Sequence, residues 1–204
     1  MANSCPANFD AQALRAEVSR IYGRVARDPD GDFHFHRGPE YAARMLDYDE
    51  ALLRDLPDRS TASFAGVANP LAMAEVRPGQ RVLDVGCGAG MDLLLAARSV
   101  GSTGEAIGVD MTSEMLESVR RSSEELGGVN VTLKRGDAED LPLAAESVDV
   151  VISNGVLNLT TDKHRAFSEI ERVLRPGGRL LLGDIAVAEE LSLDIRNDID
   201  LWTG

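Results

Sequence analysis

Cysteine is scarce in this sequence: Cys5 and Cys87 are the only two among 204 residues. They form no C-x-x-C pair and are too few for a disulfide framework, which is typical of a protein kept in a reducing compartment. We therefore expect a cytoplasmic protein. We expect no metal centre either, because His34 and His36 have no third ligand close to them in the sequence.

Positive charge is scarce as well, with 21 Lys and Arg against 34 Asp and Glu and a net charge of −13. This balance argues against a nucleic-acid partner, because phosphate backbones are bound by clustered Lys and Arg. No apolar run reaches the length of a membrane span, and the first residues offer no signal-peptide core, since they include Asp10, Arg15 and Glu17. The composition favours a protein that acts on a small molecule, away from membranes.

The most informative stretch is 81–90, which reads RVLDVGCGAG. An apolar strand runs into a loop with glycine at every second position (Gly86, Gly88 and Gly90), and the loop opens a helix over 91–100. Glycines there let the backbone turn sharply and let a ligand approach it closely. This is the first strand, turn and helix of a nucleotide-type α/β domain.

The charge and spacing of the glycine loop indicate what kind of ligand it binds. Asp84 and Asp92 flank the loop, which contains no Lys or Arg, so a ligand with cationic groups suits it better than a phosphate. A dinucleotide fingerprint needs G-x-G-x-x-G, and here Met91 stands at the third glycine position. An NAD-dependent oxidoreductase is therefore a weak alternative.

Near-continuous apolar segments alternate with helical ones along the rest of the chain. We expect strands at 82–85, 106–109, 129–133, 148–152 and 179–182. This alternation predicts a Rossmann-like, doubly wound, mostly parallel sheet covered on both faces. Residues 1–57 lack strand signals and are expected to form a helical lid, and residues 58–204 the sheet domain.

Polar residues follow several of these strands, at the edge where open α/β sheets bind ligands. Asp110 lies 20 residues beyond Gly90, where a carboxylate can accept hydrogen bonds from two ribose hydroxyls. If the ligand carries an adenine ring, Asp137 is placed to accept from its amino group, with Met111 and Ala138 flanking the ring. Asn154 ends the fourth strand. A capping or solvated role is the alternative for each acid.

The pattern D-x-G-x-G-x-G at 84–90 resembles motif I of the class I S-adenosylmethionine-dependent methyltransferases. From about Leu46 onward the chain resembles the arsenite methyltransferases, and more loosely the quinone-biosynthesis methyltransferases, in the stretches 68–71, 108–112, 153–154, 162–163 and 172–178. The resemblance implies S-adenosylmethionine as cofactor and Tyr22 as a residue closing over it. The cofactor-binding residues would be Asp84, Gly86, Cys87, Gly88, Gly90, Asp110, Met111, Asp137, Ala138 and Asn154.

The chain also departs from that family. Arsenite methyltransferases hold trivalent arsenic with cysteine thiolates, which are soft ligands for a soft centre. This chain has Val67 and Gly155 at two of those positions, and a third cysteine would follow Gly204. The family sheet normally continues with two more strands, so we expect a truncated chain whose fifth strand is an exposed edge and a contact for a dimer.

These observations predict an S-adenosylmethionine-dependent methyltransferase that acts on a small molecule by in-line methyl transfer. The alternative is a protein that binds the cofactor but is catalytically silent, as a regulatory or partner protein. The candidate catalytic residues are Tyr22, His34, His36 and Asn154. We expect residues 9–57 to be a mobile cover in which Tyr22 and both histidines face the substrate.

Overall fold

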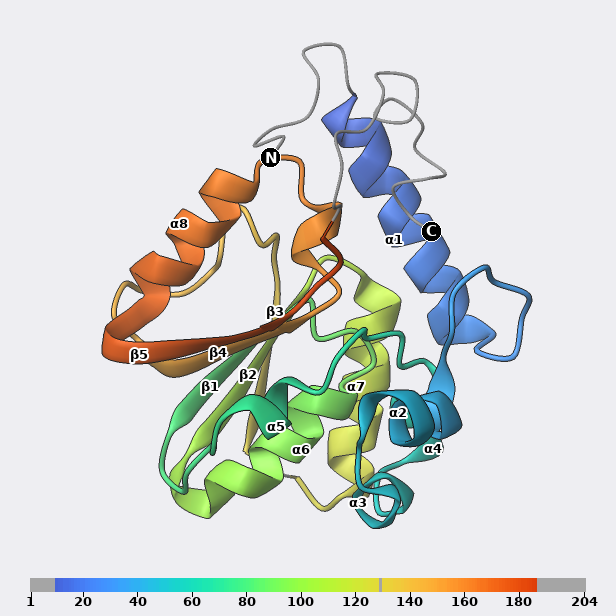
Figure 1. The fold of residues 1–204 in the computed structure, drawn as a ribbon, viewed down its shortest axis with the longest axis horizontal. Helices are drawn as coiled ribbons and strands as arrows, with labels where there is room; N and C mark the ends of the chain where they lie inside the picture. Colours follow the sequence, from blue (N-terminus) through green and yellow to red (C-terminus); the bar gives the residue numbers. More distant parts are fainter. Residues whose placement is uncertain (1–9, 129, 187–204) are drawn as a thin grey trace.

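A single parallel sheet forms the centre of the molecule. The computed structural model describes residues 10–128 and 130–186. Its strands are β1 (Arg81–Val85), β2 (Glu105–Asp110), β3 (Val131–Arg135), β4 (Val148–Asn154) and β5 (Leu174–Gly183), in the spatial order β3-β2-β1-β4-β5 (Figure 1). Every pair of neighbouring strands is parallel, which confirms the predicted Rossmann-like architecture.

The strand order reverses between β1 and β4, and the carboxyl ends of the strands are aligned there. Val85 at the end of β1 lies opposite Val109 of β2 and Ser153 of β4. Asp110 and Asn154, which end β2 and β4, therefore stand on either side of the loop that follows β1. This switch in strand order is where open α/β sheets bind ligands.

Helices cover both faces of the sheet (Figure 1). One face carries α5 (Pro70–Met73), α6 (Met91–Val100) and α7 (Ser113–Glu125), and the other carries α8 (Lys163–Val173). Two short 3-10 helices, η1 (Gly101–Thr103) and η2 (Leu157–Leu159), complete the connections. Successive strand residues point to opposite faces, so Val82 packs against α6 and Leu83 packs on the side of α8.

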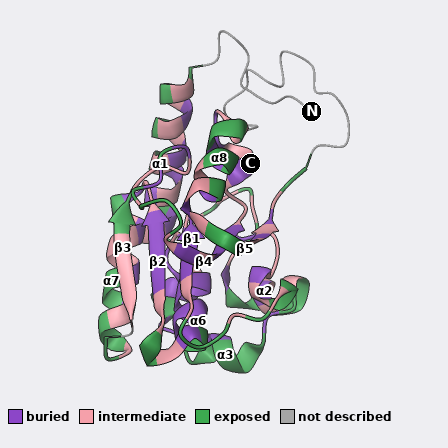
Figure 2. Ribbon diagram, turned by 90° about the vertical axis from the view of Figure 1, so that its left-hand side faces the viewer, coloured by how far each residue is buried: buried purple, intermediate pink, exposed green. Residues whose placement is uncertain are grey.

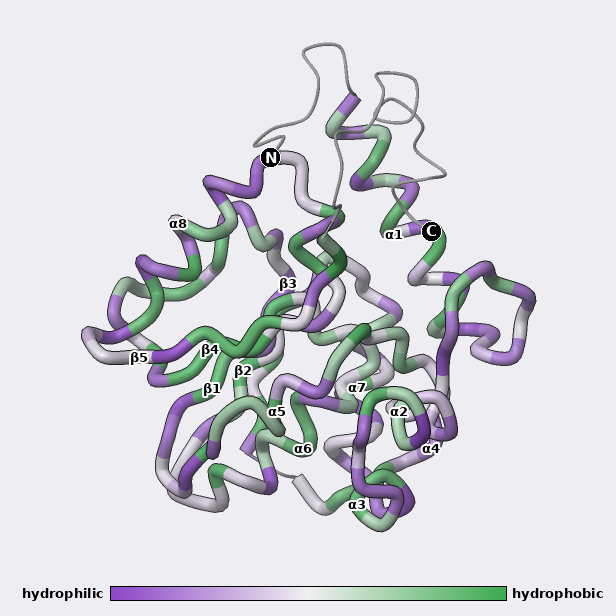
Figure 3. The backbone as a smooth tube through the Cα atoms, viewed as in Figure 1, coloured by the Kyte–Doolittle hydropathy of each residue, from purple (hydrophilic) through white to green (hydrophobic). Residues whose placement is uncertain are grey.

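Burial and hydropathy agree on the position of the core. Figure 2 shows the buried residues concentrated in β1, β2, β4 and α6, and Figure 3 shows the same segments as hydrophobic. β5 pairs with β4 alone among the described strands, and several of its residues are exposed. A dimer contact through that edge stays a prediction, and Cys5 and the stretch 202–204 lie outside the described residues.

The N-terminal segment is helical, as predicted. It comprises α1 (Ala11–Arg27), α2 (Gly38–Leu46), α3 (Glu50–Arg54) and α4 (Asp58–Ala62). Residues of α2, α3 and the following loops share one hydrophobic cluster with α6, made of Ala42, Tyr48, Leu53, Leu56, Phe64, Met91, Leu94 and Leu95. The predicted boundary at residue 57 falls within this cluster. Separate from it, α1 lies beside α7, where Arg27 forms an ion pair with Glu114.

Candidate functional site

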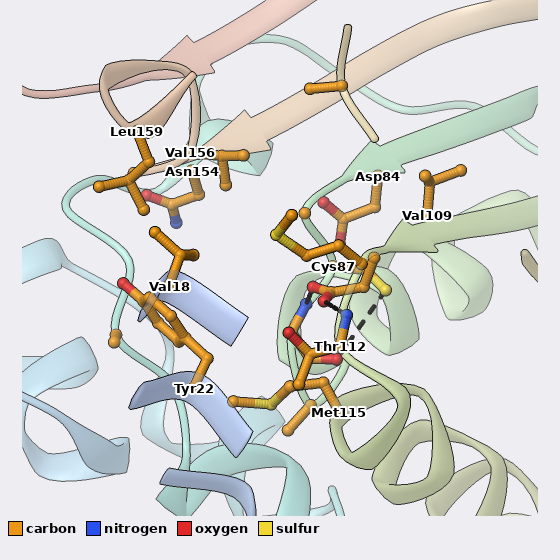
Figure 4. Close-up of a pocket in the computed structure, with 18 of the residues that line it drawn as sticks. Val18, Tyr22, Asp84, Cys87, Val109, Thr112, Met115, Asn154, Val156 and Leu159 are labelled. Atoms are coloured by element: carbon orange, nitrogen blue, oxygen red, sulfur yellow. Dashed lines mark hydrogen bonds between the residues drawn. The ribbon is translucent and has the colours of Figure 1, made fainter. Parts of the chain in front are cut away.

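A cavity opens at the carboxyl ends of the strands and is covered by α1 (Figure 4). Most of the residues singled out from the sequence line it together: Tyr22, Asp84, Gly86, Cys87, Gly88, Gly90, Asp110, Met111, Asp137, Ala138 and Asn154. Tyr22 comes from α1; the others lie at the ends of β1, β2 and β4 or in the loops after β1, β2 and β3, and the alignment of the strand ends brings them together. His34 and His36 are not among the lining residues.

The glycine loop forms the floor of the cavity. Gly86, Gly88 and Gly90 have φ angles of 70°, 51° and 93°, in the left-handed region that favours glycine. A Cβ at Gly86 would lie 2.5 Å from Val156 Cγ2, whereas a Cβ at Gly88 would meet nothing within 4 Å. Gly86 is therefore required by packing, and the space over Gly88 is free for a ligand.

Asp110 is held by the backbone of the glycine loop. Its carboxylate accepts hydrogen bonds from the Gly88 amide at 2.9 Å and the Thr112 amide at 2.8 Å. Burial raises the pKa of Asp110, while these amide donors act in the opposite direction. Each carboxylate oxygen can accept more than one hydrogen bond. Asp110 is thus an oriented acceptor with capacity left for ligand hydroxyls.

Asp84 and Asp92 add two buried carboxyl groups to this floor, with exposures of 3% and 6%. Burial raises the pKa of Asp84 well above its ordinary value, and the nearby charges of Asp92 and Asp110 raise it further. Burial also raises the pKa of Asp92 to about 6. A cationic group placed among these carboxyls would favour their ionised forms.

Asn154 lines the cavity, but its amide group is occupied by internal partners. Its Oδ1 accepts from the amides of Val67 and Ala68, at 2.7 and 3.0 Å. Its Nδ2 donates to Asp92 Oδ2 at 2.9 Å and to the Ala68 carbonyl at 2.8 Å. The sequence predicts a cofactor or catalytic role for Asn154. The structure instead places its amide as a brace between β4, α6 and the segment 66–68.

Asp92 has a second donor in Tyr48, which sequence reasoning missed. The Tyr48 hydroxyl donates to Asp92 Oδ1 at 2.6 Å and also lies 3.1 Å from the Ala68 carbonyl. Tyr48 is 6% exposed, so this contact is shielded from solvent. The position of Asp92, two residues after the last loop glycine, indicates from the sequence that it lies near the cavity. Its partner Tyr48 lies 44 residues away, so the sequence does not indicate their contact.

Asp137, the predicted adenine acceptor, is bound by a residue of α1. Arg15 Nε donates to Asp137 Oδ2 at 2.8 Å, and Arg15 Nη2 donates to Glu139 Oε2 at 2.7 Å. Glu139 is 6% exposed, and its other oxygen accepts from Thr161 and from the Asp162 amide. Arg15 therefore ties α1 to the loop after β3 and, through Glu139, to the start of α8.

The loop that follows α1 does not deliver its histidines to the cavity. The side chains of His34 and His36 are exposed, and the His36 ring stacks on Tyr41 with centroids 5.3 Å apart. Phe33 and Phe35 pack inward beneath them, and Phe35 stacks on Tyr22 at 5.9 Å. In this structure His34 and His36 do not line the cavity, so their predicted role toward a substrate is not supported by their position and stays a prediction. The alternation along 33–36 turns the phenylalanines toward the protein and the histidines toward solvent.

Comparison with known proteins identifies the family. Residues 77–203 match a family model described as a methyltransferase domain. An arsenite methyltransferase of Halobacterium salinarum is 46% identical over 162 residues, which are 79% of this chain and 41% of that protein. The chain belongs to the class I S-adenosylmethionine-dependent methyltransferases. Within them it is similar to the arsenite methyltransferases.

Solved structures support the same assignment. The crystal structure of an arsenic (III) S-adenosylmethionine methyltransferase from Chlamydomonas reinhardtii matches with a TM-score of 0.66 and 38% identity, over 71% of this chain and 51% of that one. The [4+2]-cyclase SpnF shares the fold, with a TM-score of 0.60 and 22% identity over 87% of this chain and 62% of that one. The chain thus spans about half the length of the relatives it matches.

The cavity suits the cofactor of this methyltransferase family. S-adenosylmethionine carries a sulfonium and an ammonium, which match the buried carboxyls of Asp84, Asp92 and Asp110. The one Arg or Lys among the described lining residues is Arg15, and it is already paired with carboxylates. The open space over Gly88 and the acceptor capacity of Asp110 fit a ribose beside the loop.

Val67 and Gly155, the two positions at which the resemblance implies arsenic-binding cysteines, come together in the fold. A Cβ at Gly155 would lie 3.5 Å from Val67 Cγ1, so the two residues face each other beside the cavity. Valine and glycine offer no metalloid ligand there. Within residues 10–128 and 130–186, no group of three His, Cys, Asp or Glu side chains could hold a metal ion. In the same residues, no helix is long and apolar enough to cross a membrane.

Proposed function

We propose that this methyltransferase binds S-adenosylmethionine across the carboxyl ends of β1, β2 and β3 and transfers its methyl group to a small molecule. The observation that carries the proposal is the Asp110 carboxylate, fixed by the Gly88 and Thr112 amides beside two further buried acids. Such an arrangement suits a ligand that combines hydroxyl groups with positive charge.

Each part of the cavity has a role in this proposal. Asp110 accepts from the ribose hydroxyls, Asp137 accepts from the adenine amino group, and Met111 and Ala138 flank the ring. The carboxyls of Asp84 and Asp92 balance the positive charge of the ligand. When bound, the cofactor supplies a methyl group on a positively charged sulfur, which leaves as a neutral thioether when a nucleophile attacks in line.

The protein contributes positioning and the exclusion of water. Val18 and Tyr22 of α1 close the cavity opposite the glycine loop (Figure 4). Burial, followed by the charge of Asp110, raises the pKa of Tyr22 to about 12. Its hydroxyl therefore stays protonated at neutral pH, where it can donate a hydrogen bond but cannot serve as a general base.

A second candidate function is a protein that binds the cofactor without transferring its methyl group. One observation favours it: Val67 and Gly155 stand where the resemblance to the arsenite methyltransferases implies thiolates. The same cavity would then serve regulation or a partner, since a fold alone does not determine the chemistry of its site.

Calorimetry with S-adenosylhomocysteine tests the proposed cofactor site. Asp110→Ala should weaken binding by about 1.5–3 kcal/mol, the range for a hydrogen bond to a charged group. Asp184→Ala is the matched control, because Asp184 also follows a strand and accepts backbone amides but does not line the cavity. Equal affinities of Asp110→Ala and wild type would refute the assignment.

A screen for transfer of a labelled methyl group separates the two candidate functions. A methylated product from a panel of small molecules supports the enzyme. Cofactor binding that persists without any product across the panel supports the silent protein.

A further inference from the structure

The cavity has two walls of different chemistry. The first wall is acidic and consists of the strand ends and the glycine loop, with Asp84, Asp110 and Asp137. The second wall, here called the acceptor wall, consists of the lining residues within 60–66 and 154–161 together with Val18 and Tyr22 of α1. If the proposed function is correct, the cofactor occupies the acidic wall and the methyl acceptor meets the acceptor wall.

The polar side chains of the acceptor wall are engaged with the protein. Ser60 and Thr160 donate their hydroxyl hydrogens to the Pro57 and Leu157 carbonyls, both at 2.7 Å. Ser63 donates to the Val25 carbonyl at 3.4 Å, and Thr161 donates to Glu139 at 2.8 Å. All four residues are at most 9% exposed. The Asn154 amide is saturated as described above, so these groups offer little to a ligand.

What remains at the surface of the acceptor wall is apolar. Val156 and Leu159 project into the cavity from the segment after β4, and Val18 faces them from α1 (Figure 4). Ala65 and Gly66 also line this wall without polar side chains, next to Val67, which faces Gly155. Burying apolar ligand surface against such a wall is favourable, whereas a charged group would lose its hydration there without compensation.

Among the described side chains of this wall, one hydrogen-bond donor is left. The Tyr22 hydroxyl makes no hydrogen bond to another described residue, and Figure 4 shows its ring beside the cavity. Among the described lining residues an anionic ligand would find no unpaired cation, because Arg15 is paired with Asp137 and Glu139. A trivalent arsenical would find one cysteine among the described residues, Cys87, buried in the glycine loop.

We propose that the methyl acceptor is a neutral, predominantly apolar small molecule with a single hydrogen-bonding group. This inference rests on the proposed function, which gives the position of the methyl acceptor. The chemical class of the acceptor is inferred from the residues of the acceptor wall. Val156 and Leu159 provide the apolar contact, and Tyr22 donates the hydrogen bond. The wall selects against carboxylates and against metalloids because it offers neither an unpaired cation nor a pair of thiolates.

The test compares probes of similar size on the whole chain, with and without saturating S-adenosylhomocysteine. Thymol is neutral and apolar with one hydroxyl, cuminate is a carboxylate of similar shape, and phenylarsine oxide reports a thiol pair. Thymol should bind at least about tenfold more tightly than cuminate, and phenylarsine oxide should not bind stoichiometrically. Equal or tighter binding of cuminate, stoichiometric binding of the arsenical, or methylation of arsenite would overturn the proposal.

A variant links the thymol signal to the acceptor wall. Leu159→Asn keeps a side chain of similar size but places an amide in the wall, and should weaken thymol about tenfold without changing the affinity for S-adenosylhomocysteine. Leu52→Asn is the matched control, because Leu52 is 48% exposed on α3 and does not line the cavity. Unchanged thymol binding by Leu159→Asn overturns the inference. Failure of the wild-type protein to bind S-adenosylhomocysteine overturns the proposed function instead. In that case, thymol binding measured in the absence of S-adenosylhomocysteine still tests the acceptor wall.

Discussion

Arg15 Nε lies 2.8 Å from Asp137 Oδ2, although the two residues are 122 positions apart in the sequence. The same guanidinium reaches Glu139, which is anchored to the start of α8. The helix that covers the cavity and the carboxylate proposed to bind adenine are therefore parts of one structural unit. A change in the position of α1 would therefore also change the surroundings of Asp137.

The first prediction concerns this ion pair. Arg15→Gln leaves Asp137 and Glu139 without their shared counter-charge, so the affinity for S-adenosylhomocysteine should fall by about 0.5–1.5 kcal/mol, a range reduced for the partial exposure of Arg15. Asp137→Asn should weaken binding too, and the double variant should show less than the sum of the two effects. Calorimetry measures all three.

Arg20→Gln is the control for this prediction, because Arg20 lies on the same helix and pairs with Glu17 instead. It should leave the affinity unchanged. Tighter binding by Arg15→Gln would show that the arginine competes with the ligand for Asp137, and full additivity of the two variants would show that they act separately.

The second prediction concerns the pH dependence of stability. Burial raises the pKa of Asp92 to about 6 in the folded protein, above the ordinary value of 3.8. The stability that Asp92 contributes is thus fully present below pH 4 and is lost as the pH rises through 6. The Tyr48 hydroxyl opposes this loss by donating to the ionised carboxylate.

Tyr48→Phe should therefore cost about 2 kcal/mol at pH 8, where Asp92 is ionised, and about 1 kcal/mol at pH 5, where the lost hydrogen bond is a neutral one. Urea unfolding at both pH values measures the difference. Ser60→Ala is the control, since the buried Ser60 hydroxyl donates to the Pro57 carbonyl, which does not titrate, and its effect should not depend on pH. A cost of Tyr48→Phe that is equal at both pH values would contradict the role assigned to Asp92.

The third prediction concerns the cover. Val18 and Tyr22 line the cavity from α1, and Phe35 packs on Tyr22, so a ligand in the cavity should stabilise this region. Hydrogen exchange with and without S-adenosylhomocysteine should show protection rising in residues 18–38. The amides of residues 168–173, in the half of α8 that is remote from Glu139, should change little. Full protection of 18–38 in the free protein would mean that the cover is static packing.

Much of the fold and one wall of the site follow from local sequence patterns. The apolar runs predicted five parallel strands, and the glycine spacing at 86–90 predicted the loop that forms the cavity floor. Asp84 and Asp110 were placed correctly because they belong to strand ends, and parallel strands bring their carboxyl ends to one edge. The strand boundaries were predicted less accurately. The strands expected at 129–133 and 179–182 begin at Val131 and Leu174, because pairing with the neighbouring strands, and not residue propensity, decides where a strand begins.

The partners of the polar groups were decided by the tertiary structure alone. Nothing near Asn154 in the sequence shows that Val67, Ala68 and Asp92 would occupy its amide. Arg15 likewise reaches Asp137 only because α1 lies across the strand ends. A hydrogen-bonding side chain binds the partner that folding brings within about 3 Å. Sequence periodicity does not predict which distant residues will come that close. The sequence by itself determined where the proposed cofactor site would form, and the packing of distant segments decided which of its polar groups remain available.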